Sequence, residues 1–170
     1  MRFSFKPLSK DDLPILYQWF EQPHVIEWWP VPKKGEEFFE HFLKRIRSKD
    51  TVPFLVLLDD KPLGYIQYYS ISSEMRRWLP PLPEHSVGID QFIGESENLG
   101  KGYGPAFVKA FIEQVLSKKD VATVIVDPET VNIRAIKSYE KAEFKRVGIY
   151  VAPYGTVLIM RHDINKSENS

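Results

Sequence analysis

The stretch Leu99-Gly100-Lys101-Gly102-Tyr103-Gly104-Pro105 decides how this chain folds. Three glycines alternate with other residues, and apolar residues at helical spacing follow over 106–116. A glycine-rich turn that leads directly into a helix exposes backbone N–H groups at the positive end of the helix dipole, a geometry that binds phosphate or pyrophosphate. The alternative is a tight connection between strand and helix that binds no ligand.

Composition excludes several classes of protein. The 170 residues suffice for one domain with a substantial core, and 43% hydrophobic with 27% charged residues is typical of a globular protein. The formal net charge is zero, so we expect no nucleic-acid partner. The chain has no cysteine, and its four histidines lack metal-ligand spacing, so we expect neither disulfides nor a metal. No signal peptide or membrane-spanning run is evident, so we expect a cytoplasmic protein without a membrane partner.

Hydrophobic periodicity predicts the elements of the first half. Ser9 is the expected N-cap of the first helix, which Pro23 ends, and Pro30 and Pro32 stop a second, short one. The expected order is a strand over 2–7, helices over 9–22, 24–29 and 35–49, a strand over 53–58, a turn at 59–62 and a strand over 63–71.

The second half alternates strands and helices. After a proline-containing loop at 72–85, we expect strands at 86–93, 121–126, 145–152 and 156–162, and helices from the glycine turn to about Ser117 and over 132–142. Strand–helix–strand connections imply a locally parallel sheet, and the earlier hairpin adds antiparallel strands. The sequence therefore predicts a mixed α/β sheet with helices on both faces, as one domain over 1–164 and a frayed polar tail over 165–170.

Two motifs resemble those of the GCN5-related N-acetyltransferases (GNAT). Their acyl-CoA signature has Gln or Arg, two residues, Gly, one residue, then Gly or Ala; here it aligns with Leu99–Gly104, where Leu99 departs from Gln or Arg. Their second block has Asn and, a few residues later, Tyr-Glu-Lys-x-Gly-Phe; here it is Asn132–Phe144. The resemblance implies the GNAT fold, a mostly antiparallel mixed sheet with a parallel splayed centre and helices on both faces.

A narrower resemblance is to the aminoglycoside 6′-N-acetyltransferases. It is carried by Leu16–Trp19, His24–Trp29, Gly64–Gln67, Gly88–Gln91 and Leu99–Gly102, while siderophore-biosynthesis acetyltransferases share the His…Trp-Trp region. It implies acetyl transfer from acetyl-CoA to a primary amine, and the favoured acceptor is the 6′-amine of an aminoglycoside. The alternatives are a siderophore hydroxylamine, a polyamine, a protein N-terminus, or a CoA-binding module without catalysis. The chain is expected to act as a monomer or homodimer.

The resemblance also implies residues that bind acetyl-CoA, the co-substrate. Backbone amides of the glycine turn are expected to bind the pyrophosphate, and the pantetheine arm to lie along the strand end like an added strand. Asn132 is expected to cap its helix and to hydrogen-bond the arm. The expected donor-binding set is Gln91, Phe92, Ile93, Leu99, Gly100, Lys101, Gly102, Tyr103, Gly104 and Asn132.

Asp90 and Tyr139 are the candidates for proton transfer. With no cysteine to form an acyl-enzyme, the amine must attack the thioester directly. Asp90 is expected to bind the ammonium and to accept its proton, directly or through water; the alternative is a structural acid in a strand. Tyr139 suits protonation of the leaving thiolate, because free tyrosine has a pKa of about 10 and a thiol one near 8.5; the alternative is a core tyrosine.

The resemblance also implies acidic and aromatic residues as the candidates for holding the amine substrate. Acids attract a polyamine, and aromatic rings pack against sugar faces. Tryptophans in the core and an aspartate in a turn are the alternatives, and Arg76 and Arg77 would repel a polycation. The candidates are Glu27, Trp28, Trp29, Tyr65, Glu74, Asp90 and Asp127.

One departure from the family concerns stability. Glu143 stands where the family has Gly, at the C-terminal end of the expected helix. If Glu143 adopts the left-handed conformation, it costs roughly 1 kcal/mol relative to Gly.

Overall fold

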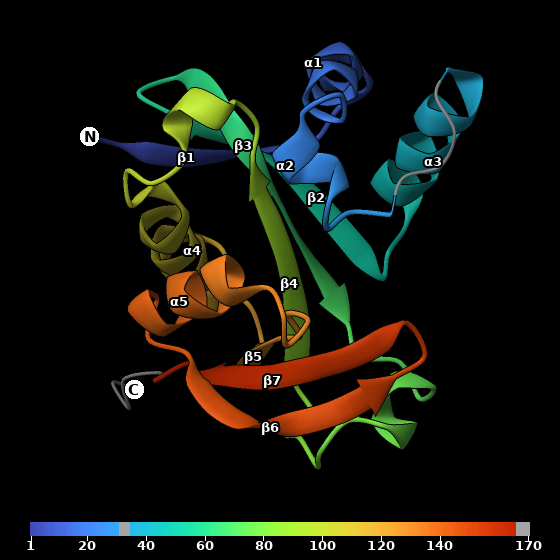
Figure 1. Cartoon of the computed structure of the whole chain (residues 1–170), viewed down its shortest axis with the longest axis vertical. Coiled ribbons are helices and arrows are strands. Elements are labelled where there is room, and N and C mark those ends of the chain that lie inside the picture. Colours follow the sequence, from blue (N-terminus) through green and yellow to red (C-terminus); the bar gives the residue numbers. More distant parts are fainter. Residues whose placement is uncertain (31–34, 166–170) are drawn as a thin grey trace. The chain divides into compact units, whose positions relative to one another are not determined.

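Figure 1 presents the structure, a computed structural model that describes residues 1–30 and 35–165. Its strands are β1 (Phe3–Pro7), β2 (Thr51–Leu58), β3 (Lys61–Ser70), β4 (Ser86–Ile93), β5 (Thr123–Val126), β6 (Lys145–Ala152) and β7 (Gly155–Asp163). Its α-helices are α1 (Leu13–Trp19), α2 (Pro23–Ile26), α3 (Glu36–Arg47), α4 (Tyr103–Gln114) and α5 (Ile133–Lys141). The expected stop at Pro32 and the tail over 166–170 lie outside the described residues.

The strands hydrogen-bond in the order β1-β2-β3-β4-β5-β7-β6. The pairs β1–β2, β5–β7 and β6–β7 are antiparallel, whereas β4 and β5 are parallel. This confirms the predicted mixed, mostly antiparallel sheet. The chain divides into two compact units, one of residues 1–68 and 90–104 and the other of residues 69–89 and 105 onward, and each is described in turn.

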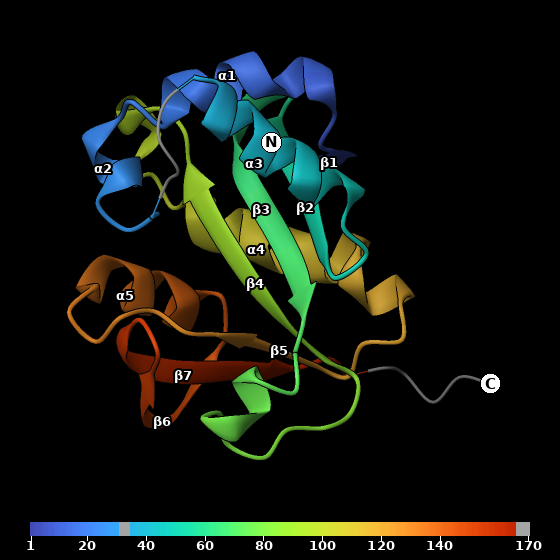
Figure 2. The same cartoon turned by 90° about the vertical axis from the view of Figure 1, so that its right-hand side faces the viewer.

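The first unit has an aromatic core. Helices α1 and α3 lie beside β2 and β3 (Figure 2), and α3 contributes Phe38 and Phe42, one helical turn apart. Trp19 of α1 is 1% exposed, and a Cβ at Gly94 would lie 2.1 Å from its ring, so that position must be glycine. The buried members of this core are Leu8, Leu13, Leu16, Trp19, Phe20, Val25, Phe38, Phe42, Leu55, Tyr65 and Phe92.

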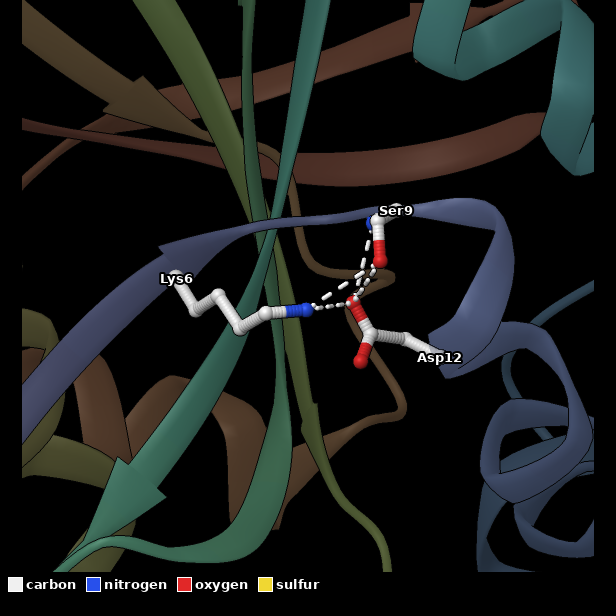
Figure 3. Close-up of polar contacts among 3 residues, drawn as sticks. All are labelled: Lys6, Ser9 and Asp12. Atoms are coloured by element: carbon white, nitrogen blue, oxygen red, sulfur yellow. Dashed lines mark hydrogen bonds and ion pairs between the residues drawn. The ribbon is translucent and has the colours of Figure 1, made fainter.

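Ser9 begins the helical segment, as predicted, through contacts with Asp12 (Figure 3). The Ser9 backbone N–H donates to Asp12 Oδ2 at 2.9 Å, and Lys6 Nζ donates to the same oxygen at 2.6 Å. Burial alone would raise the pKa of Asp12, but the hydrogen bonds from Lys6 and Ser9 hold it below its ordinary value. A short 3-10 turn, Lys10–Asp12, then leads into α1.

Several boundaries in this unit differ from the prediction, and two of them have a clear physical reason. Helix α1 ends at Trp19, and Pro23 begins α2 instead of ending α1, because the fixed φ of proline suits the first helical position, where its missing N–H is not needed. The hairpin turn contains Asp59 and Asp60 alone, with φ values of 49° and 66°, and Lys61 already belongs to β3. Positive φ at both central residues matches the right-handed strand twist.

The second unit packs β5, β6 and β7 against the segment that follows β3. Its buried core residues are Leu79, Ile125, Ala152, Val157 and Ile159. The segment predicted as an irregular loop contains a 3-10 helix, Met75–Arg77, and places Leu79 in this core. The segment is therefore more ordered than its proline content suggested.

Helix α5 begins and ends with well-defined caps. Asn132 accepts a hydrogen bond from the Ala135 N–H at its start, which confirms the predicted cap. At its end the Glu143 N–H donates to Glu140 O and the Phe144 N–H donates to Tyr139 O, each at 3.0 Å. This is a Schellman motif, in which the residue after the cap is left-handed, and Glu143 indeed has φ of 71°.

Replacing Glu143 with Gly is expected to raise the free energy of unfolding by about 1 kcal/mol, since a side chain at positive φ is strained. Glu143 also pairs with Lys109 at 3.5 Å, but both side chains are exposed and such pairs contribute little. Urea unfolding of Glu143→Gly beside Glu143→Ala separates the two effects. Alanine removes the ion pair and keeps the strain, so an equal gain from alanine would contradict the backbone explanation.

Candidate acetyl-transfer site

Asp90 lies in β4, just beyond the segment where β4 pairs with β5. The parallel ladder joins Ser86–Gly88 to Thr123–Ile125 and includes no residue after Gly88. Asp90 is partly buried, while the residue before it, Ile89, is fully buried. Because successive side chains of a strand point to opposite faces, the Asp90 side chain lies on the face opposite to that of Ile89.

A buried hydrogen-bond chain holds Asp90. Gln67 Nε2 donates to Asp90 Oδ2 at 2.9 Å, and the Tyr65 hydroxyl donates to Gln67 Oε1 at 2.6 Å. Gln67 is 6% exposed and Tyr65 is 0% exposed. Sequence analysis did not select Gln67, although a polar side chain at an inward position of an apolar strand, two residues after Tyr65, was the available signal.

The surroundings of Asp90 disfavour its charged form. Burial raises the pKa of its carboxyl, and this effect outweighs the opposing effects of the Gln67 hydrogen bond and the positive charge of Arg45. A carboxyl with a raised pKa is a better proton acceptor for an amine than an ordinary aspartate. Asp90 therefore has a property that a proton-transfer residue needs.

The glycine turn has the backbone that a phosphate site requires. Gly100 and Gly102 have φ of 72° and 80°, which L-residues rarely adopt, and a Cβ at either would meet no atom within 4 Å. Helix α4 begins at Tyr103, whose ring contacts Phe3 edge-on with centroids 6.5 Å apart. Open space beside a helix start, where the first backbone N–H groups have no partner within the helix, fits a pyrophosphate. Lys101 is exposed, whereas Leu99 is partly buried and Gly104 is buried.

The strand end expected to bind the pantetheine arm is held by contacts within the first unit. His24 Nε2 lies 2.8 Å from the Ile93 carbonyl oxygen, so α2 is tied to the end of β4. On β3, a Cβ at Gly64 would lie 2.3 Å from the Phe92 carbonyl oxygen, which requires glycine there. Gln91 and Ile93 are partly buried and Phe92 is buried.

Of the aromatic substrate candidates, Trp29 and Tyr65 belong to the core of the first unit. The Trp29 ring meets the rings of Tyr65 and Phe92 edge-on, with centroids 5.6 and 5.1 Å apart, and Tyr65 stacks on Phe92 at 5.3 Å. Tyr65 is fully buried, so its contact with the site passes through Gln67. Trp28 is partly buried and Glu27 is exposed.

Tyr139 belongs to the second unit, where it is 6% exposed. Its ring lies 5.5 Å from that of Phe144, the apolar contact that accompanies a Schellman motif. The same motif holds the Tyr139 carbonyl, so both the backbone and the ring of Tyr139 are fixed at the end of α5. Asn132, at the other end of α5, is partly buried.

The remaining candidates also lie in the second unit. Asp127 follows β5, is partly buried and accepts a hydrogen bond from the Tyr154 hydroxyl, and the Tyr154 ring meets Trp78 edge-on at 5.9 Å. Glu74 is exposed at the start of the 3-10 helix. The guanidinium of Arg76 lies 3.5 Å from the Leu82 and Glu84 carbonyl oxygens, so part of its hydrogen-bonding capacity braces this segment.

In residues 1–30 and 35–165, no group of three or more histidine, aspartate or glutamate side chains is placed to hold a metal ion. Across the same residues, none of the helices has the length and apolar character to cross a membrane.

Comparison with known proteins identifies the family. Residues 9–151 match the family described as "Acetyltransferase (GNAT) domain". The aminoglycoside N(6')-acetyltransferase type 1 of Klebsiella pneumoniae is 33% identical over 162 residues, covering 90% of this chain and 79% of the relative. The N-hydroxyputrescine acetyltransferase of Acinetobacter baumannii is 23% identical over 146 residues, covering 86% of this chain and 66% of the relative.

A solved structure supports the same family assignment. The aminoglycoside acetyltransferase AAC(6')-Ib, crystallised with coenzyme A and kanamycin, superposes with a TM-score of 0.85 at 29% identity, covering 95% of each chain. The family match covers residues 9–151 and the likeness to this structure covers 95% of the chain, in agreement with the narrower resemblance, whose residues are spread from Leu16 to Gly102. The chain is therefore an acetyltransferase of the GNAT family, related within it to the aminoglycoside N(6')-acetyltransferases.

Proposed function

We propose that the chain transfers an acetyl group from acetyl-CoA to a primary amine of an aminoglycoside, at the 6′ position. The observation that carries the proposal is the similarity to AAC(6')-Ib with bound coenzyme A and kanamycin, which extends over 95% of both chains. The aminoglycoside N(6')-acetyltransferase of Klebsiella pneumoniae supports the same acceptor at 33% identity.

In this proposal Asp90 receives a proton from the substrate ammonium. An alkyl ammonium must lose a proton before its nitrogen can attack, and the raised pKa of the Asp90 carboxyl makes it a better acceptor. Among the described residues, only Gln67 donates a hydrogen bond to the Asp90 side chain, and it occupies Oδ2. Oδ1 therefore remains available to the ammonium or to a water molecule between them.

Acetyl-CoA supplies a thioester, in which the C–S bond breaks as the amine forms its C–N bond. The backbone amides around Gly100 and Gly102 bind the pyrophosphate, because their positive φ values and open surroundings let phosphate approach closely. Tyr139 donates its hydroxyl proton to the departing sulfur, since an ordinary tyrosine pKa of about 10 lies near that of a thiol. Asn132 caps α5 and thereby supports the position of Tyr139.

The acceptor is held by acidic and aromatic groups. Asp90 and Asp127 supply negative charge, Glu27 and Glu74 are exposed acids, and the partly buried Trp28 and Trp29 supply ring faces. We also propose that residues 1–164 act as a single acetyltransferase domain, because the family match over 9–151 includes residues of both units.

A thiol-release assay across candidate acceptors tests the function. The expected result is acetyl-CoA-dependent turnover with kanamycin and tobramycin, and acetylation of the 6′-amine in the isolated product. Polyamines, hydroxylysine and an N-terminal peptide serve as comparison acceptors. Turnover confined to a comparison acceptor would contradict the aminoglycoside assignment, and failure of acetyl-CoA to raise the melting temperature would contradict donor binding.

A further inference from the structure

The hydrogen-bond chain behind Asp90 continues to the side of α3. Arg45 NH1 lies 3.4 Å from the Tyr65 hydroxyl oxygen, and Arg45 NH2 lies 2.8 Å from His41 Nε2. The Arg45 guanidinium also lies over the Phe42 ring, 5.1 Å from its centroid. Every group between α3 and Asp90 thus has a partner on each side.

Arg45, at one end of this hydrogen-bond series, sets the direction of every hydrogen bond between it and Asp90. Arginine has no acceptor, so the Tyr65 oxygen accepts from Arg45 and the Tyr65 proton points to Gln67 Oε1. Because the Gln67 oxygen accepts from Tyr65, its amide nitrogen is the group that faces Asp90, and Nε2 donates to Asp90 Oδ2. The series therefore has one polarity, from a cation to a carboxylate, and each bond strengthens the next.

His41 completes the series at its cationic end. Because Arg45 only donates, His41 Nε2 must accept from it, which requires a neutral imidazole. Burial lowers the pKa of His41, and the positive charges of Arg45 and Lys44 lower it further. His41 therefore remains an acceptor that holds Arg45 in place.

We propose that Gln67 is a positioning residue for the amine-accepting carboxylate: its amide, oriented by Tyr65 and Arg45, holds Asp90 Oδ2 and leaves Oδ1 for the substrate ammonium. The inference rests on the proposed function, in which Asp90 receives the amine. It reassigns Tyr65 from substrate contact to support, consistent with its complete burial. Without the Tyr65 hydroxyl, the Gln67 amide loses the contact that selects its orientation, and it can rotate to turn an oxygen toward Asp90.

The test compares Gln67→Leu and Tyr65→Phe with Tyr68→Phe, a matched tyrosine on the same strand whose ring lies by Phe54. We expect kcat/KM for the amine to fall on the order of tenfold in Gln67→Leu, as for loss of a hydrogen bond to a charged group. The acidic limb of the pH–rate profile should move to higher pH, because the Gln67 hydrogen bond and Arg45 both favour the ionised Asp90. KM for acetyl-CoA and all properties of Tyr68→Phe should stay unchanged.

A titration of the Asp90 side-chain carboxyl by ¹³C NMR keeps this test independent of turnover. The midpoint of the Asp90 titration should move to higher pH in Gln67→Leu and, by a smaller amount, in Tyr65→Phe. Tyr65→Phe removes a single oxygen atom, so it provides the test if Gln67→Leu does not fold. Folded variants with the parent's titration and pH–rate profile would overturn the inference. A parent protein that binds acetyl-CoA but acetylates no amine would instead overturn the proposed function.

Discussion

Replacing Asp90 with Asn is expected to lower kcat/KM for the amine about 10²- to 10⁴-fold, the usual contribution of a positioned general base. Asparagine keeps the size of the side chain, and its carbonyl oxygen can still accept from Gln67 Nε2. The change therefore removes the proton acceptor and leaves the hydrogen-bond chain intact. Steady-state kinetics with saturating acetyl-CoA measure the effect.

The same substitution is expected to stabilise the free protein at neutral pH. A raised carboxyl pKa means that the folded state binds the proton more tightly than the unfolded state, so stability falls as pH rises from the ordinary value of 3.8 through the folded value. Asparagine does not ionise and avoids this loss. The melting temperature of Asp90→Asn should exceed that of the parent at neutral pH, and the difference should shrink toward acidic pH.

The two measurements distinguish a catalytic Asp90 from a structural one. If Asp90 had only a structural role, Asp90→Asn would lower the free energy of unfolding, and activity would fall only through loss of folded protein. Parent-like kcat/KM in a well-folded Asp90→Asn would contradict the role of Asp90 as the proton acceptor. A melting-temperature difference that grows toward acidic pH would contradict the direction of its pKa shift.

Tyr139→Phe is expected to lower kcat about 100-fold, near the lower end of the range for loss of a general acid. Phenylalanine keeps the ring that packs by Phe144 and leaves the Schellman motif, which uses backbone groups, unchanged. The dissociation constant for CoA, measured by calorimetry, should therefore stay within about threefold of the parent, a difference of less than 1 kcal/mol. The loss should appear in the chemical step alone.

Tyr150→Phe is the control for this experiment, because Tyr150 is a partly buried tyrosine of the same unit. It should leave kcat and the CoA affinity unchanged. An unchanged kcat in Tyr139→Phe would remove Tyr139 as the acid and leave it as a core residue. Equal losses in kcat and in CoA affinity would indicate that the hydroxyl serves donor binding.

Sequence patterns predicted most of the fold because each pattern reports a local preference. Strand β4 and strand β6 have the predicted bounds, since alternation and flanking turn residues delimit them. The predicted start of α2 was wrong, because a proline such as Pro23 can end one helix or begin the next. The order in the loop before β4 was missed, because it depends on packing of Leu79 in a core formed by distant residues.

The sequence by itself determined the family and the glycine turn, and it proposed Asp90 and Tyr139 as candidates, because motif spacing and residue chemistry are properties of the chain alone. Only the tertiary structure decided what surrounds these residues. Gln67, Tyr65 and Arg45 lie far from Asp90 in sequence, and strand pairing and helix packing bring them into one hydrogen-bond chain. The raised pKa of Asp90 arises from that burial, which no local pattern encodes.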